Sequence, residues 1–324
     1  MKTLTLRALV FGLGVVGGLA AFAAQTHRAM AAASVSLPSG SYETRTTIPV
    51  TIDGQRATCI LDTGTSAIVV SQSLAQAAHL SAQAGTFEVA PDGRTYMDRQ
   101  TEISTFGVAG HALHNVPALI SSNLTQPDAL CGYDFFAHFP TLIDRDRRLV
   151  TLFPAASQFA RMHCAQVDLS SHVPLATVEI NGTWFNHIVF DSGMGGGGML
   201  WEGVRTQLQH PLVANANFQT MPGAVAKGFA CGAIASVRYA PGAPQSSMPV
   251  CTEPQRPDGD NGIIETNVDS VHAMAVDYPH QRICFDVSGY SEVASPASPA
   301  YTRQQASAPR DAWARFNYLR PPKT

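Results

Sequence analysis

Two short stretches of the sequence carry the same pattern, and this pattern decides the fold. Residues 60–66 read ILDTGTS, and residues 188–193 read IVFDSG. In each stretch a short apolar run, of the kind that forms buried strands, ends in an acidic residue, a hydroxyl-bearing residue and a glycine. The two acidic residues are Asp62 and Asp191.

A turn signal precedes each of these stretches at nearly the same distance. Asp53-Gly54 lies before the first stretch and Asn181-Gly182 before the second. Asp-Gly and Asn-Gly between alternating apolar residues are strong signals of a two-residue β-turn, because both positions of that turn need positive φ. The sequence therefore predicts the same β-hairpin in both halves of the chain.

The segments downstream of the two stretches also match. Residues 130–152 align without gaps to residues 263–285, at a constant offset of 133. An aspartate falls at the same place in each segment, as Asp144 or Asp277. One duplication explains all of these matches, so we infer two copies of a β-rich lobe, at roughly residues 41–158 and 161–288.

Short strands with glycine turns, and little helix, are expected within each lobe. The expected elements are hairpins at residues 47–61 and 103–120, short helices at residues 71–80, 133–138 and 202–209, and a turn at Pro222-Gly223. The fold class is thus all-β, with two lobes related by a pseudo-twofold axis.

Composition limits the classes of function that the chain can serve. Only 14% of its 324 residues are charged, and the net charge is −3. An average globular protein has ~25% charged residues, and nucleic-acid binding needs clustered Lys and Arg. No run of basic residues exceeds two, as in Arg147-Arg148. A nucleic-acid partner is therefore excluded.

Residues 1–33 have the features of an export signal. Lys2 and Arg7 precede an uncharged apolar stretch, and Ala29-Met30-Ala31 matches a cleavage site. The alternative is an uncleaved anchor, because ~17 apolar residues are the lower limit for spanning a bilayer. We expect an exported protein, periplasmic or extracellular, with no other membrane contact. The remaining domains are the lobes at residues 34–159 and 160–288 and a low-complexity tail at residues 289–324.

Export places the six cysteines in an oxidising compartment, where disulfide bonds form. Cys231 and Cys251 flank one loop rich in Gly, Pro and Ser, which favours their pairing. The other pairs that we expect are Cys164–Cys284 and Cys59–Cys131. The alternative for Cys59 and Cys131, which lie in apolar strands, is that they are buried free thiols.

The two acidic triplets resemble the active-site loops of aspartic proteases of the retropepsin and pepsin kind. The residues that carry the resemblance are Asp62-Thr63-Gly64, Asp191-Ser192-Gly193 and the apolar-apolar-glycine segment that ends at Gly132. The resemblance covers nearly all of residues 41–288. It implies the acid-protease fold, with two retropepsin-like β-barrel lobes and few short helices.

The resemblance also implies an aspartic endopeptidase with Asp62 and Asp191 as its catalytic residues. Hydrolysis by an activated water needs one carboxylate as general base and one carboxyl as general acid. Two carboxyls ~3 Å apart cannot both ionise cheaply, so they share a proton. The residues expected to support the active-site loops are Thr63, Gly64, Thr65, Ser192 and Gly193.

Two residues of the second lobe depart from the family pattern. Met194 follows the triplet where the first lobe has Thr65, and Glu265 stands where the family has glycine. These departures leave a second interpretation open, a catalytically inactive protease-like scaffold that binds a peptide or protein. The Thr65 hydroxyl can donate a hydrogen bond to Asp62 and so stabilise its ionised form. We therefore expect Asp62 to be the base and Asp191 the acid.

The expected substrate is an extended peptide or unfolded protein, bound by strand-like backbone pairing. Asp92 and Gly93 form a turn that could tip a mobile hairpin, a flap, and Tyr96 beside it is a candidate to close over substrate; a plain cross-strand aromatic is the alternative. Candidates to line side-chain pockets are Leu61 or Ile60, Leu130 and Val189. No metal or organic cofactor is implied. Because both halves belong to one chain, we expect a monomer.

Overall fold

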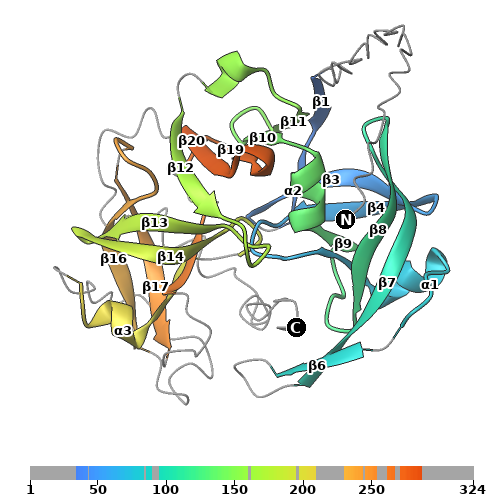
Figure 1. Ribbon diagram of the computed structural model, residues 1–324, viewed down its shortest axis with the longest axis horizontal. Coiled ribbons are helices and arrows are strands. Elements are labelled where there is room, and N and C mark those ends of the chain that lie inside the picture. Colours follow the sequence, from blue (N-terminus) through green and yellow to red (C-terminus); the bar gives the residue numbers. More distant parts are fainter. Residues whose placement is uncertain are drawn as a thin grey trace, which may run out of the picture. The chain divides into compact units, whose positions relative to one another are not determined.

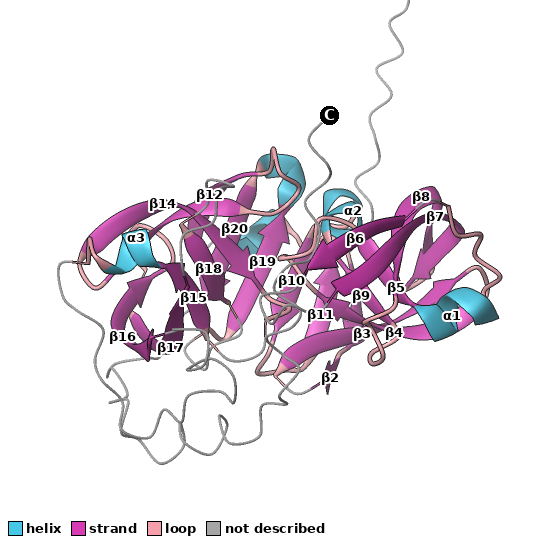
Figure 2. Ribbon diagram, turned by 90° about the horizontal axis from the view of Figure 1, so that it is seen from below, coloured by secondary structure: helices cyan, strands magenta, loops and turns pink. Residues whose placement is uncertain are grey.

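Strands dominate the protein, and its helices are short (Figures 1 and 2). The computed structural model describes residues 34–42, 44–83, 85–89, 95–159, 162–194, 197–208, 230–243, 245–253, 261–266 and 271–286. The expected all-β class is confirmed, and the described strands form two lobes, each built around a closed six-stranded barrel.

Within the described residues, six strands of the first lobe close into a barrel. They follow the order β3-β4-β9-β5-β8-β7, and β7 pairs with β3 to complete the ring. Their bounds are β3 (Arg45–Ile52), β4 (Gln55–Leu61), β5 (Ile68–Ser71), β7 (Thr95–Val108), β8 (His111–Ser121) and β9 (Ala129–Cys131). Two further strands extend the sheet, β2 (Gly40–Tyr42) beside β3 and β6 (Gly85–Val89) beside β7.

The second lobe repeats this ring strand for strand in the part of the chain that the structure covers. The order is β13-β14-β18-β15-β17-β16, and β16 pairs with β13. The bounds are β13 (Leu175–Ile180), β14 (Thr183–Asp191), β15 (Gly198–Trp201), β16 (Ala230–Arg238), β17 (Ser246–Glu253) and β18 (Gly262–Glu265). Each strand of one barrel therefore has an equivalent in the other.

The two predicted hairpin turns have the same backbone conformation. Asp53 and Gly54 have φ of 45° and 82°, and Asn181 and Gly182 have φ of 47° and 84°. Positive φ at both central residues is the requirement of the tight turn that suits the strand twist, which explains the choice of Asp-Gly and Asn-Gly. The turns join β3 to β4 and β13 to β14, as predicted.

A third set of strands connects the two barrels. It runs in the order β1-β11-β10-β19-β20-β12 and continues from β12 into β13 of the second barrel. Its strands are β1 (Val35–Pro38), β10 (Thr141–Asp144), β11 (Leu149–Leu152), β12 (His163–Asp168), β19 (Ala273–Asp277) and β20 (Arg282–Asp286).

The centre of this connecting sheet lies on the pseudo-twofold axis. β10 and β19 are antiparallel, and Leu142 pairs with Ala275. These two residues are also equivalent under the sequence offset of 133. Residues that are both equivalent and directly paired must lie where the symmetry axis crosses the sheet. The register thus confirms the internal repeat.

Alternation of side chains along the strands builds the core. In β3, Ile48, Val50 and Ile52 are buried while Pro49 and Thr51 are exposed. This period of two is expected of a strand with one face on a barrel interior, because successive side chains point to opposite faces.

The described helices are short, and two of them are shorter than predicted. They are α1 (Gln72–Ala77), α2 (Tyr133–His138) and α3 (Glu202–Arg205), with 3-10 turns η1 (Ala156–Phe159) and η3 (Tyr278–His280). The predictions of helices at residues 71–80 and 202–209 were too long, since α1 has six residues and α3 has four. Its N-terminus has no side-chain cap, whereas the Ser71 hydroxyl accepts the Leu74 N–H at the start of α1. The predicted turn at Pro222-Gly223 lies outside the described residues.

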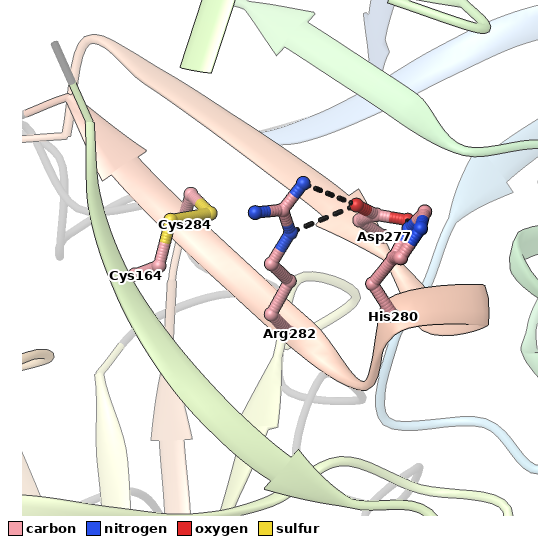
Figure 3. The surroundings of a disulfide bond; sticks show 5 residues. All are labelled: Cys164, Asp277, His280, Arg282 and Cys284. Atoms are coloured by element: carbon pink, nitrogen blue, oxygen red, sulfur yellow. Dashed lines mark hydrogen bonds and ion pairs between the residues drawn. A yellow bond between two sulfur atoms is a disulfide. The ribbon is translucent and has the colours of Figure 1, made fainter. Parts of the chain in front are cut away.

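Two of the expected disulfide bonds are present. Cys59–Cys131 joins β4 to β9, and Cys164–Cys284 joins β12 to β20 (Figure 3). Cys251 is also disulfide-bonded, and its backbone register partner on β16 is Cys231. The alternative of free thiols for Cys59 and Cys131 is therefore wrong.

The repeat-related aspartates at the ends of β10 and β19 hold the turns that follow them. Asp144 accepts the backbone N–H of Arg147 at 2.9 Å. Asp277 bonds Arg282 at 2.8 Å and His280 at 2.7 Å (Figure 3). Among the described residues, no helix is long and apolar enough to cross a membrane. The proposed boundaries of the lobes and of the two terminal segments stay predictions.

Candidate active site

The two acidic triplets occupy equivalent positions at the ends of equivalent strands. Asp62 directly follows β4, and Asp191 is the last residue of β14. In the first barrel β4 runs parallel to β9, and Leu61 pairs with Cys131. In the second barrel β14 runs parallel to β18, and Asp191 pairs with Glu265. The chain leaves the sheet at each aspartate, so each carboxyl lies at the end of a strand.

The two carboxyls meet. Asp62 and Asp191 are hydrogen-bonded to each other through their side chains. The glycine of each triplet faces the carboxyl of the other lobe: a Cβ added to Gly64 would collide with Asp191, and one added to Gly193 would collide with Asp62. Glycine at these positions therefore permits the close approach of the two acidic side chains.

Four buried hydrogen bonds join the two loops beneath the carboxyls. The Thr63 hydroxyl donates to Phe190 O at 2.8 Å and accepts the Ser192 N–H at 3.0 Å. The Ser192 hydroxyl donates to Leu61 O at 2.8 Å and accepts the Thr63 N–H at 3.0 Å. Each hydroxyl thus acts as donor and acceptor across the pseudo-twofold axis. The expected connection of the loops through these two hydroxyls is present.

The two carboxyls receive different hydrogen-bond donors. Asp62 accepts the Gly64 N–H at 3.0 Å and also the Thr65 hydroxyl. Asp191 accepts the N–H groups of Gly193 and Met194, at 2.7 and 2.9 Å. The second lobe therefore replaces the hydroxyl donor of the first lobe with a backbone donor, because Met194 has no side-chain donor.

Burial raises the pKa of Asp62 above the usual value for aspartate. The hydrogen bond from Thr65 and the nearby positive charge of Arg45 oppose this effect, since both stabilise the ionised carboxylate. Asp62 is thus the carboxyl of the pair with the stronger support for a negative charge.

The pKa of Asp191 is raised well above the usual value, first by removal of water and second by the charge of Asp62. The backbone donors lower it, and the charge of Glu265 raises it further. Asp191 keeps part of its surface exposed, whereas Asp62 is buried. The surroundings therefore favour a protonated Asp191 beside an ionised Asp62.

Two residues near the pair carry no signal in the sequence patterns. Arg45, in β3, is buried and acts on Asp62 by its charge. Tyr278, in η3, donates its hydroxyl to Thr63 O at 3.5 Å, and burial followed by the two carboxyls raises its pKa. No repeated motif or spacing in the sequence distinguishes either residue.

The other predicted site residues fall in different places. Tyr96 belongs to β7 and pairs with Glu88 of β6, while Asp92 and Gly93 lie outside the described residues. Leu61 packs in the main core, whereas Ile60 and Leu130 form a separate apolar cluster with Val69 and Leu124. Leu61 is therefore not available as a pocket residue.

The second lobe has the equivalent of this separate cluster. Val189, Ile263, Val173 and Met194 pack together, apart from the main core. Val189 and Ile263 occupy the positions that Ile60 and Leu130 occupy in the first lobe. In the described part of the chain, no group of three or more His, Cys, Asp or Glu side chains could hold a metal ion.

Replacing Thr63 with valine should destabilise the protein by about 2–4 kcal/mol, because Phe190 O and the Ser192 N–H would be left buried without their partner. The free energy of unfolding can be measured with urea. Thr58→Val, on the exposed face of β4, is the control and should change stability by less than about 0.5 kcal/mol. Equal effects of the two substitutions would contradict the importance of the Thr63 bonds.

Asp191→Asn should stabilise the protein at neutral pH but not at acid pH. A carboxyl whose pKa is raised by folding contributes most below its unfolded pKa, and this contribution is lost as pH rises through the folded pKa. The gain in melting temperature should therefore grow between about pH 3 and pH 7. Asp168→Asn is the control of opposite sign, because the Ser170 N–H lowers the pKa of Asp168.

Part of the chain matches a known protein family. Residues 48–138 match the protein family described as "gag-polyprotein putative aspartyl protease". This segment contains Asp62, Thr63 and Gly64 and ends within α2. No curated protein matches the chain at a significant level.

Solved structures of similar fold include plant and bacterial proteins. Basic 7S globulin from soybean has 12% identity and a TM-score of 0.45, over 79% of this chain and 95% of that one. A retropepsin-like aspartic protease from Rickettsia conorii has 14% identity and a TM-score of 0.30, over 37% of this chain and 91% of that one. The match to an aspartyl protease family thus covers residues 48–138, within the first lobe.

Proposed function

We propose that the protein is an aspartic endopeptidase that hydrolyses peptide bonds with a water molecule activated between Asp62 and Asp191. The observation that carries the proposal is the hydrogen bond between these two carboxyls, one from each lobe. A pair of carboxyls that shares one proton supplies a general base and a general acid at a single place.

The roles of the two residues follow from their different surroundings. Asp62, supported by Thr65 and Arg45, takes a proton from the water, whose oxygen then attacks the carbonyl carbon of the peptide. Asp191 gives its proton to the carbonyl oxygen, and the carbonyl carbon becomes the centre of a tetrahedral intermediate. Asp62 then gives the proton that it took from the water to the amide nitrogen, and Asp191 takes a proton back from a hydroxyl of the intermediate. The C–N bond breaks, which leaves a carboxylic acid and an amine and returns both carboxyls to their starting states.

An extended peptide or unfolded protein is the proposed substrate. Its backbone would pair with strand edges near the carboxyls, and its apolar side chains would pack beside the clusters of Ile60 and Leu130 and of Val189 and Ile263. These clusters are repeat-related, so apolar side chains on both sides of the cleaved bond are favoured.

The compartment of this activity is proposed from the cysteines. The disulfide bonds Cys59–Cys131 and Cys164–Cys284 are typical of an oxidising environment. Together with the features of residues 1–33, they support an exported protein in the periplasm or outside the cell. With both lobes in one chain, a monomer suffices to complete the site.

A second candidate function is binding without cleavage. Met194 and Glu265 favour it, because they change the surroundings of Asp191 relative to those of Asp62. The four hydrogen bonds of Thr63 and Ser192 count against it, since a scaffold that only binds does not need two carboxyls held in contact.

The deciding experiment is hydrolysis of an unfolded protein by the purified chain, from about pH 3 to pH 8. We expect cleavage that Asp62→Asn and Asp191→Asn each reduce by about 10²–10⁴-fold. A peptide analogue with a central hydroxyl, which mimics the tetrahedral intermediate, should block it. Tight peptide binding with no cleavage at any pH would instead establish the inactive scaffold.

Thr65→Ala should shift the acid limb of the pH profile of kcat/KM to higher pH. The Thr65 hydroxyl lowers the pKa of Asp62, so its loss raises that pKa, and the base becomes protonated at a higher pH. Thr58→Val, at an exposed position of β4, serves as the control and should leave the limb in place. An unmoved acid limb in Thr65→Ala would refute the assignment of Asp62 as base, but not the function.

A further inference from the structure

Glu265 stands where the symmetry of the two lobes would place a glycine. In the first lobe the equivalent residue is Gly132, and a Cβ added there would collide with backbone atoms of Thr65 and Ala67. The chain that follows the first triplet therefore runs directly over Gly132. The second lobe needs a different path at this point, because Glu265 carries a full side chain and is buried.

The second lobe has a longer connection between its triplet and the next strand. In the first lobe, Ile68 of β5 pairs opposite β9 after five residues beyond Asp62. In the second lobe, the equivalent Gly198 of β15 pairs opposite β18 after six residues beyond Asp191. One additional residue, within a run of glycines, thus separates the second triplet from the next strand.

Glu265 holds the end of this longer connection on both sides. Its side-chain Oε2 accepts the Gly197 N–H at 2.8 Å, and its own backbone N–H donates to Gly197 O at 2.9 Å. The backbone O of Glu265 in turn accepts the buried Tyr239 hydroxyl at 3.0 Å. Gly197 has φ of 116°, a conformation that other residues rarely adopt. Glu265 therefore holds Gly197, three residues after Met194, in a backbone conformation that suits glycine.

The same carboxylate lies close enough to Asp191 to act on its charge. Glu265 and Asp191 are register partners on the parallel strands β18 and β14, and the charge of Glu265 raises the pKa of Asp191. The other ionisable groups near the pair are Arg45, whose charge lowers the pKa of Asp62, and Tyr278 of η3, whose own pKa the two carboxyls raise. Among these groups, Glu265 is the one whose charge acts on Asp191 and not on Asp62.

We propose that Glu265 is a positioning residue of the second half of the site: it fixes the Gly197 turn, and its carboxylate keeps the shared proton on Asp191. This inference rests on the proposed function for its consequence in catalysis. Thr65 and Arg45 favour the negative charge on Asp62, and Glu265 disfavours it on Asp191. Thr65, Arg45 and Glu265 therefore all favour Asp191 as the general acid.

Glu265→Gln separates the two roles. The amide oxygen can still accept the Gly197 N–H, but the negative charge is gone. Loss of the charge lowers the pKa of Asp191, so the acid loses its proton at a lower pH. The alkaline limb of kcat/KM should move down by about half a pH unit or more, while the rate at the acid optimum is kept.

Glu265→Ala removes both the charge and the acceptor for Gly197, and should lower the rate at every pH by about tenfold or more. Glu202→Gln, on the surface of α3, is the matched control for loss of one carboxylate and should move neither limb. Equal losses in Glu265→Gln and Glu265→Ala at all pH values, or an alkaline limb that does not move in Glu265→Gln, would overturn the proposal.

A measurement without turnover distinguishes this inference from the proposed function. The carboxyl carbon of Asp191 can be titrated by NMR in protein labelled at aspartate and assigned with Asp191→Asn. A lower apparent pKa of the pair in Glu265→Gln supports the inference even if the wild-type chain cleaves nothing, and an unchanged titration overturns it even if the chain is an active protease. If Glu265→Gln does not fold, Glu265→Gly removes the same charge and should give the same shift.

Discussion

The reciprocal hydrogen bonds of Thr63 and Ser192 are the interaction on which the site depends. Each hydroxyl is buried and bonds two backbone groups of the opposite lobe. A buried hydroxyl or backbone group without a partner costs free energy, so this network is stable only when all its members are in place. It fixes the two loops against each other, and the carboxyls of Asp62 and Asp191 are brought into contact as a result.

The backbones of the two lobes are related by symmetry, but the charges around the two carboxyls are not. The barrels share strand order, turn conformation and the central register at Leu142 and Ala275. The charges around the carboxyls differ, with Arg45 acting on Asp62 and Glu265 acting on Asp191. A symmetric scaffold determines where the carboxyls lie, and the asymmetric neighbours determine which of them holds the proton.

Much of the fold could be predicted because the sequence repeats. The Asp-Gly and Asn-Gly turns need particular φ values, and the offset of 133 identifies equivalent strands, so local chemistry and the repeat agree. The length of α3 could not be predicted, because residues 206–209 contain neither a glycine nor a proline that would mark the end of a helix. The choice between Ile60 and Leu61 also needed the structure, because neighbouring strand residues face opposite sides and sequence alone does not say which side is the main core.

The candidate site was predictable to a similar extent. Asp62, Asp191, Thr63 and Ser192 stand in the repeated motif, and their contacts agree with it. Arg45 and Tyr278 reach the pair from β3 and η3 through tertiary packing, which leaves no pattern in the sequence. Glu265 was visible as a departure, but no sequence pattern predicts its hydrogen bond with Gly197.

The register of β10 on β19 has a consequence for how such a site can change. A sheet centred on a twofold axis could equally be built by two identical chains, each contributing one barrel. In that arrangement every substitution would occur in both halves at once. A glycine in one half could then never be combined with a glutamate at the equivalent position of the other half. Joining the halves in one polypeptide removes that restriction, so position 132 can stay glycine while position 265 carries a charge.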